Sequence, residues 1–151
     1  MAIASKLNSD GFRVYCLLGD GEIEEGQIWE AAMSAAHYKL DNLCVIVDNN
    51  NLQIDGEITE VMSSYPIDKK FESFGFNVIN VDGHNIEELI EAFSKAKTVK
   101  GRPTVVIAKT IKGKGVSFME NQVSWHGKAP NEEQYRKAID ELLKLEREEN
   151  I

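Results

Sequence analysis

The chain has 151 residues, a length that suits one domain able to bury most of the surface its unfolded form exposes. Seventeen basic residues stand against twenty-five acidic ones, which leaves a formal net charge of −8. This balance excludes nucleic acid and anionic membranes as default partners, because contact with phosphates requires clustered lysine and arginine. No stretch has the apolar length of a bilayer span, and the first residues lack the features of a signal peptide. The sequence therefore predicts a cytoplasmic protein.

Short apolar runs along the chain predict four β-strands covered on both faces, because their apolar residues are continuous rather than alternating. The predicted strands are Phe12–Leu18, Asn42–Asp48, Phe76–Gly83 and Pro103–Thr110. Cys16 and Cys44 lie inside the first two runs, without the spacing of metal ligands. We expect both to be buried free thiols in a reducing compartment.

Helical patterns separate and follow these runs, at Gln27–Leu40, Tyr65–Gly75, Asn85–Lys97 and Asn131–Asn150. Alternation of strands and helices predicts an α/β fold, with an open, mostly parallel sheet and helices on both faces. The first eight residues look like the tail of a helix already under way, and four strands are few for this architecture. We therefore expect a single domain, 1–151, that lacks upstream elements, either as a fragment or as one subunit of a larger assembly.

Two polar loops follow the first two predicted strands, which is where open parallel sheets bind ligands. GDG, Gly19 to Gly21, follows the first strand, and Asn50 follows the second strand thirty positions after Asp20. If these strands are neighbours, a carboxylate and an amide oxygen face one crevice and suit a hard cation such as Mg²⁺ or Ca²⁺. The cation would bridge Asp20 to phosphates, while the glycines let backbone N–H groups approach them. Each motif alone is a common turn, but their coupling across one strand–helix–strand unit is much less common.

The segment Gly19–Gly56, GDGEIEEGQIWEAAMSAAHYKLDNLCVIVDNNNLQIDG, resembles the thiamine diphosphate motif, which starts with GDG and ends near NN. Its EEG, EA, LDNL and QIDG resemble transketolase in particular. The resemblance continues through Lys109–Gly127, where transketolases have their own KT–G–G run ending in HG, and so covers nearly the whole chain. It implies the diphosphate-binding domain of a transketolase, which uses thiamine diphosphate and Mg²⁺ or Ca²⁺.

The resemblance also implies individual roles. Asp20 and Asn50 would be side-chain ligands of the metal, and the backbone carbonyl of Leu52 would be a third. Gly21 would contact the diphosphate through its N–H, and the loop residues Gly19 and Glu22 would belong to the same cofactor site. Ile54 matches an apolar residue that lines the cofactor.

Three further residues match functional positions of transketolases. His126 matches a histidine near the diphosphate and the substrate, although a lone histidine in such a loop is more often structural. Glu25 and Glu30 match glutamates at a subunit interface, where a shared proton would raise at least one pKa. Read without the family, these two acids are simply solvated, and so are Glu22 and Glu24.

The resemblance covers only one of the two domains that hold the cofactor in transketolases. The pyrimidine-binding domain has no counterpart, and neither do the upstream histidines and the glycine-rich loop of the family. One interpretation is a split transketolase that moves a two-carbon ketol unit between sugar phosphates together with a pyrimidine-binding partner. The alternative is a truncated remnant that folds and oligomerises without turnover. Either interpretation predicts a homodimer or hetero-oligomer, because missing neighbours leave apolar surface exposed.

Other enzymes share parts of the motif. The diphosphate-binding parts of 1-deoxyxylulose-5-phosphate synthase and of 2-oxo-acid dehydrogenases also have GDG and a downstream asparagine, but EEG and the KT…HG segment favour transketolase. A Rossmann dinucleotide domain fits less well, because its GxGxxG fingerprint would require glycine where Glu24 stands.

Overall fold

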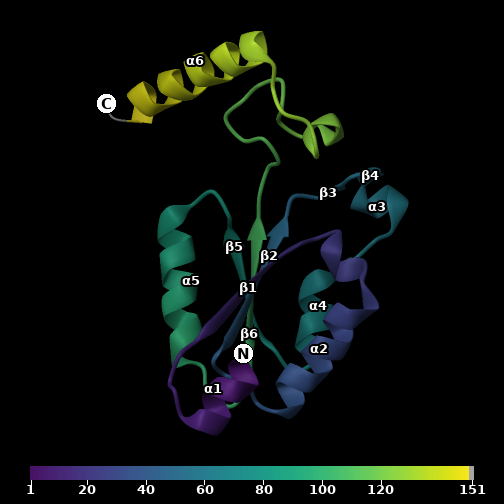
Figure 1. Ribbon diagram of the computed structural model, residues 1–151, viewed down its shortest axis with the longest axis vertical. Helices are drawn as coiled ribbons and strands as arrows, with labels where there is room; N and C mark the ends of the chain where they lie inside the picture. The colour runs from purple at the N-terminus through teal and green to yellow at the C-terminus, as the bar shows by residue number, and fades with distance from the viewer. Residues whose placement is uncertain (150–151) are drawn as a thin grey trace.

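The structure, a computed structural model, describes residues 1–149 and contains the expected parallel sheet (Figure 1). Its four strands are β1 (Val14–Gly19), β2 (Leu43–Asn49), β5 (Asn77–Asp82) and β6 (Thr104–Lys109), in the spatial order β1-β2-β6-β5. All three neighbouring pairs are parallel. The predicted α/β class and the four predicted strands are therefore confirmed. Position 150, the last of the predicted C-terminal helix, lies outside the described residues.

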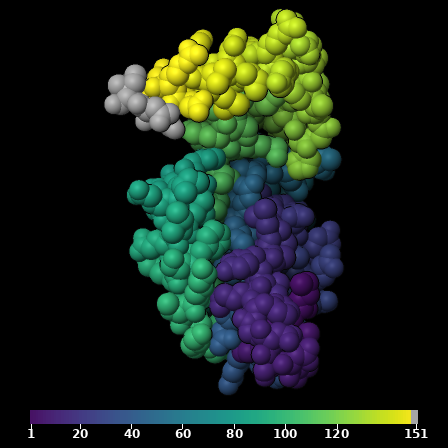
Figure 2. Space-filling view, turned by 60° about the vertical axis from the view of Figure 1, so that its left-hand side comes forward, coloured from purple at the N-terminus to yellow at the C-terminus, as the bar shows by residue number. Residues whose placement is uncertain are grey.

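Helices cover both faces of the sheet, as the alternating pattern predicted (Figure 1). Helices α2 (Gly26–His37) and α4 (Ile67–Ser73) lie on one face, and α5 (Ile86–Thr98) lies on the other. Helix α1 (Ala2–Asn8) lies by the amino ends of the strands, whereas α6 (Glu132–Glu149) lies beyond their carboxyl ends. The space-filling view shows the same order, with purple N-terminal residues at one end and yellow α6 at the other (Figure 2).

Several short elements were not predicted from the sequence, because one or two turns of chain carry no periodic pattern. They are the 3₁₀ helices η1 (Glu22–Glu24) and η2 (Val123–Trp125), the hairpin strands β3 (Leu52–Gln53) and β4 (Gly56–Glu57), and helix α3 (Ile58–Val61). Most of them lie at the carboxyl end of the sheet.

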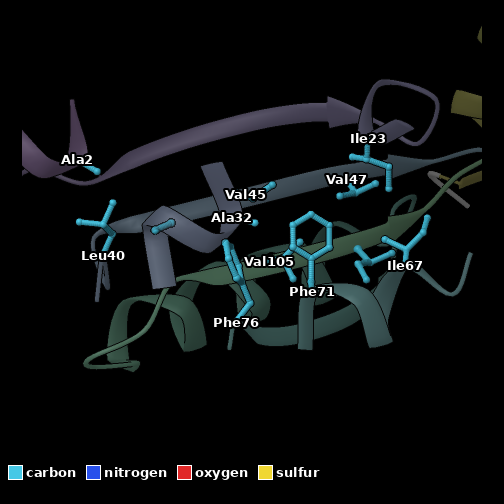
Figure 3. Close-up of a cluster of buried hydrophobic side chains, with 12 residues drawn as sticks. Ala2, Ile23, Ala32, Leu40, Val45, Val47, Ile67, Phe71, Phe76 and Val105 are labelled. Carbon is cyan, nitrogen blue, oxygen red and sulfur yellow. The ribbon is translucent and has the colours of Figure 1, made fainter. Parts of the chain in front are cut away.

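The larger core lies between the sheet and helices α2 and α4 (Figure 3). Phe71 of α4 is 1% exposed and packs against Trp29 of α2, with ring centroids 5.1 Å apart. Alanines such as Ala32 and Ala35 allow α2 to approach the strands closely. A smaller cluster on the opposite face joins Cys44 and Val106 to Ala92 and Ala96 of α5.

Strand β1 departs from the expectation that every strand is covered on both faces. Leu17 is 69% exposed and Tyr15 is 47% exposed, because β1 is an edge strand whose α5 side is only partly covered. Cys44 is buried as expected, but the prediction for Cys16 was wrong, because this thiol is exposed. Its side of β1 opens into an apolar hollow of about 470 Å³ bordered by α1 and α2.

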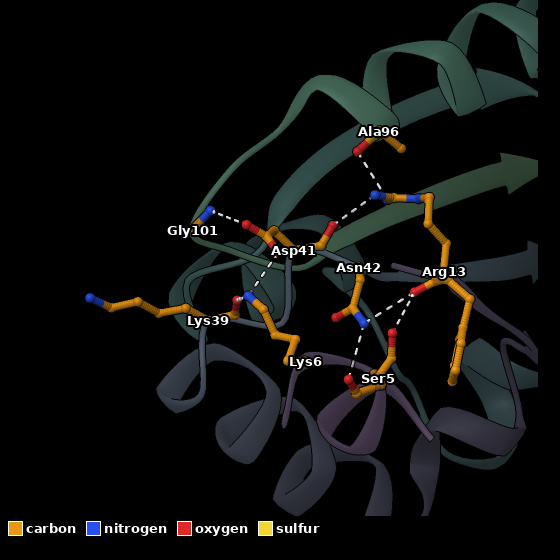
Figure 4. A network of polar contacts seen from close by, with 10 residues as sticks. Ser5, Lys6, Arg13, Lys39, Asp41, Asn42, Ala96 and Gly101 are labelled. Atoms are coloured by element: carbon orange, nitrogen blue, oxygen red, sulfur yellow. Dashed lines mark hydrogen bonds and ion pairs between the residues drawn. The ribbon is translucent and has the colours of Figure 1, made fainter. Parts of the chain in front are cut away.

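The amino end of the sheet is held by a polar network (Figure 4). Asp41 accepts hydrogen bonds from Lys6 Nζ at 2.8 Å and from the backbone N–H of Gly101 at 2.9 Å. Arg13 donates to the backbone oxygens of Asp41 and Ala96. The network therefore ties α1, α5 and the loops that precede β1, β2 and β6. Within residues 1–149, no helix is long and apolar enough to cross a membrane.

Candidate cofactor and metal site

The candidate site lies at the carboxyl ends of β1 and β2, which are neighbours. Gly19, the last residue of β1, pairs with Asp48 of β2, so the loops that carry Asp20 and Asn50 start side by side. Both loops border a cavity of about 740 Å³. The cavity is lined by nine residues to which the sequence assigned a role, namely Gly19, Asp20, Gly21, Glu22, Glu25, Asn50, Leu52, Ile54 and His126.

Asp20 is the most deeply buried acid of this site, with 1% of its surface exposed. Its Oδ2 accepts hydrogen bonds from the backbone N–H of Asn51 at 2.5 Å and from Nδ2 of Asn49 at 2.9 Å. Desolvation raises the pKa of the Asp20 carboxyl, and these two hydrogen bonds offset part of that rise. The side chain is thus a desolvated carboxylate that is hydrogen-bonded by the last residue of β2 and by the loop that follows it.

The loop after β2 turns sharply at Asn50. Its Oδ1 accepts a hydrogen bond from the backbone N–H of Leu52 at 2.9 Å, which closes an Asx turn. Asn51 has a positive φ of 64°, a conformation that asparagine tolerates better than most residues. The turn leads into the β3–β4 hairpin, whose tip carries Ile54 with 66% of its surface exposed. The loop and hairpin therefore bring Asn50, Leu52 and Ile54 to the lining of one cavity.

The GDG loop is held by a hydrogen bond within the loop and by close contact with the β3–β4 hairpin. Glu22 accepts a hydrogen bond from the backbone N–H of Gly19 at 2.6 Å. A Cβ at Gly21 would lie 3.0 Å from Cβ of Gln53, so glycine lets the hairpin approach this loop closely. Glu25 is exposed and precedes the first residue of α2.

His126 reaches the cavity from the long segment that follows β6. It comes directly after η2, and Trp125 Nε1 donates to the backbone oxygen of Phe118 at 3.0 Å. Gly113 has a positive φ of 73°, and a Cβ there would fall 2.6 Å from the backbone oxygen of Met119, so this tight turn requires glycine. The fold of this segment brings a residue more than a hundred positions away in sequence to the cavity that Asp20 lines.

The structure also adds site residues that the sequence analysis did not single out. Asp48, Gln53 and Lys112 line the same cavity, and Asn49 contacts Asp20 directly. The two polar loops could have indicated Asp48 and Gln53, because they lie beside Asn50, but nothing local marked Lys112. Glu30 is exposed on α2 and is not among the residues that line the cavity.

The donor set fits a hard cation better than a soft one. Among residues 1–149, no three His, Cys, Asp or Glu side chains cluster as a transition-metal site would require. No basic side chain in this part of the chain forms an ion pair with Asp20. Buried polar atoms without a partner include Asn51 Oδ1 and Gln53 Nε2, both next to the site. A buried carboxylate without a basic partner, beside the side-chain amide of Asn50, suits Mg²⁺ or Ca²⁺.

Fold and site together define an open parallel α/β domain with a polar cavity at the carboxyl edge of its sheet. Residues 3–147 match the family model described as transketolase, thiamine diphosphate binding domain. The chain belongs to this family, and the resemblance to transketolase is confirmed.

Relatives and solved structures agree with this membership. The chain is 42% identical to an apulose-4-phosphate transketolase subunit of Phocaeicola vulgatus, over 99% of this chain and 55% of that protein. It is 47% identical to human transketolase, over 87% of this chain and 20% of that protein. The crystal structure of Campylobacter jejuni transketolase superposes with a TM-score of 0.85 at 35% identity, over 93% of this chain and 22% of the other. The chain thus spans about half the length of the subunit-type relatives that it matches.

Proposed function

We propose that this chain is the diphosphate- and metal-binding half of a transketolase. Together with a partner that carries the pyrimidine-binding domain, it would transfer a two-carbon ketol unit between sugar phosphates in the cytoplasm. The observation that carries the proposal is the meeting of Asp20, Asn50 and His126 around one cavity. Relatives named as transketolase subunits support a divided enzyme, and a Pichia stipitis transketolase that superposes with a TM-score of 0.84 at 26% identity was solved with sedoheptulose-7-phosphate.

In this proposal the chain holds the charged end of the cofactor. Thiamine diphosphate supplies the nucleophilic carbon of the reaction when it is bound. Asp20, Asn50 and the backbone carbonyl of Leu52 would hold Mg²⁺ or Ca²⁺, and the cation would neutralise both the diphosphate and the buried carboxylate. Gly21 would donate its backbone N–H to the diphosphate, with Gly19 and Glu22 shaping the loop around it.

The remaining residues would act on the substrate side and at the interface. His126 would donate a hydrogen bond to the diphosphate or to a substrate oxygen. Ile54 would cover the apolar part of the cofactor. Glu25 is exposed at the rim of the cavity, where it would meet a second subunit in a homodimer or hetero-oligomer.

Calorimetry with Asp20→Ala tests the metal and cofactor assignment. The wild-type chain should bind thiamine diphosphate in a Mg²⁺-dependent manner, with reduced affinity because half of the site belongs to the partner. The variant should lose this Mg²⁺-dependent binding, because it lacks the only buried carboxylate among the described residues that line the cavity. Unchanged affinity in the variant would show that the metal assignment is wrong.

A second experiment separates a catalytic subunit from a truncated remnant that only folds and assembles. Both alternatives are compatible with a chain that spans about half the length of its subunit-type relatives. The chain is mixed with a pyrimidine-domain subunit, thiamine diphosphate and Mg²⁺, and ketol transfer between sugar phosphates is assayed. Turnover supports the catalytic proposal, whereas a stable complex without turnover with any candidate partner supports the remnant.

A further inference from the structure

The Asp20 carboxylate is contacted by a neighbouring side chain through an N–H donor rather than through an oxygen. Asn49 is the last residue of β2, and its backbone is fixed because its carbonyl accepts a hydrogen bond from the N–H of Thr110 at 3.2 Å. From this position Asn49 Nδ2 donates to Asp20 Oδ2 at 2.9 Å. The amide therefore links the end of β2 to the carboxylate at the end of β1.

Tyr65 in turn holds the Asn49 amide. Its hydroxyl oxygen accepts a hydrogen bond from Asn49 Nδ2 at 2.9 Å and donates to Asn49 Oδ1 at 3.2 Å. The connection that carries Tyr65 is fixed beside it, because Lys70 Nζ donates to the backbone oxygen of Ser64 at 2.8 Å. Tyr65, which lies just before α4, is thus connected to Asp20 through the side chain of Asn49.

Asn49 contacts Asp20 through Nδ2, which is a donor and therefore cannot bind a cation. Its Nδ2 is a donor with both hydrogens engaged, and its Oδ1 accepts from Tyr65. Both long-range donors to Asp20 end on Oδ2, which fixes the carboxylate plane before any cation arrives. Groups that orient metal ligands in this way commonly change metal affinity by about 10- to 100-fold when they are removed.

We propose that Asn49 and Tyr65 are positioning residues, in series, for the Asp20 carboxylate at the cation site. Asn49 holds Oδ2, and Tyr65 keeps the Asn49 amide facing Asp20. This inference rests on the proposed function, because it takes Asp20 as a metal ligand. It adds that the affinity for the cation is set in part by the segment before α4, which is far from the GDG loop in sequence.

The test measures binding of Mn²⁺, as a spectroscopic substitute for Mg²⁺, to the full chain in the presence of thiamine diphosphate. Free Mn²⁺ is followed by electron paramagnetic resonance, and the melting temperature of each metal-free variant is measured beside it. Asn49→Leu removes the amide at similar volume, Tyr65→Phe removes one oxygen from a residue that is 40% exposed, and Asp20→Ala is the reference for loss of the ligand. Asn80→Leu is the control, because exposed Asn80 lies on β5, two strands away from β2.

We expect Asn49→Leu to weaken Mn²⁺ binding at least about 10-fold. Tyr65→Phe should weaken it by about 3-fold, as expected for one neutral hydrogen bond. The double variant should match Asn49→Leu alone, because Tyr65 acts through Asn49. The control variant should bind Mn²⁺ like the wild type.

Each contrary result has a distinct meaning. Wild-type affinity in folded Asn49→Leu, with only the metal-free melting temperature lowered, would show a purely structural role and overturn the inference. If Asn49→Leu does not fold, unchanged affinity in Tyr65→Phe overturns it instead. If Asp20→Ala loses Mn²⁺ binding while the Asn49 and Tyr65 variants bind it like the wild type, the proposed function is supported and this inference is overturned. Binding retained in Asp20→Ala, or no cofactor-dependent binding by the wild type, would overturn both.

Discussion

Two aspartates at opposite ends of the same sheet have opposite environments. Asp41, at the amino end, is half-buried and receives hydrogen bonds from Gly101 and Lys6, which lower the pKa of its carboxyl. Asp20, at the carboxyl end, is almost fully buried, and desolvation raises the pKa of its carboxyl. One acid has its charge compensated within the chain, whereas the other keeps an uncompensated charge that a bound cation can neutralise.

The contrast shows how one small domain separates stability from binding. The polar groups of the amino end join α1, α5 and the loops before β1, β2 and β6 into one network, in which the Asp41 charge is paired with Lys6 (Figure 4). At the carboxyl end, side-chain atoms such as Asn51 Oδ1 and Gln53 Nε2 are buried without partners. Arg13 Nε and Asn42 Oδ1 at the amino end also lack partners, so such atoms do not by themselves distinguish the two ends. The two ends differ in the buried Asp20 carboxylate, which has no basic partner among the described residues.

The largest effect is expected from Asp20→Asn, which tests whether the buried Asp20 carboxylate binds the cation while lowering the stability of the metal-free fold. The variant should lose about 100-fold or more in Mg²⁺-dependent cofactor affinity. Its metal-free form should be more stable than the wild type at neutral pH, because the neutral amide does not carry the desolvation cost of the carboxylate. A raised folded-state pKa means that the wild type loses stability as pH rises from 3.8 through that pKa. Thermal unfolding curves should therefore show that the extra stability of Asp20→Asn over the wild type vanishes below pH 3.8. A variant less stable than the wild type at pH 7 would contradict the stated difference between Asp20 and Asp41.

Asp41→Ala tests the amino end and should have an intermediate effect. Loss of the bonds to Gly101 and Lys6 should destabilise the chain by about 1 to 2 kcal/mol at pH 7. The lowered folded-state pKa means that the contribution is present above 3.8 and is lost as pH falls through the folded value. The difference in melting temperature should shrink in acid, while cofactor affinity at neutral pH stays unchanged. A large loss of affinity would show that the two ends are not separate.

The smallest effect is expected at Glu22, whose carboxylate holds the GDG loop from within. Glu22→Ala removes the acceptor of the Gly19 N–H and should cost about 0.5 to 1 kcal/mol in chemical denaturation. Glu22→Gln keeps an acceptor and serves as the matched control, with a smaller loss. Equal losses in both variants would mean that the charge, rather than the hydrogen bond, stabilises this loop.

Local pattern was sufficient for much of the fold. Continuous apolar runs predicted all four strands of the parallel sheet, and the predicted helix Asn85–Lys97 agrees with α5, whose cap Asn85 accepts from the N–H groups of Glu87 and Glu88. The carboxyl-edge position of Asp20 and Asn50 also followed, because parallel strands end at the same edge. The exposure of β1 could not be predicted, because an apolar run alone does not tell which strand lies at the edge of the sheet. For this reason Cys16 was wrongly expected to be buried.

The sequence by itself determined the fold class, the family resemblance and the residue types available for a cation and a diphosphate. Only the tertiary structure brought His126 and Lys112 to the cavity of Asp20, because their positions depend on the path of the chain after β6. It alone joined Tyr65 to Asp20 through Asn49, since hydrogen bonds between distant segments leave no periodic signal in sequence. Local propensity shapes each element, whereas the packing of the sheet decides which side chains meet at its edge.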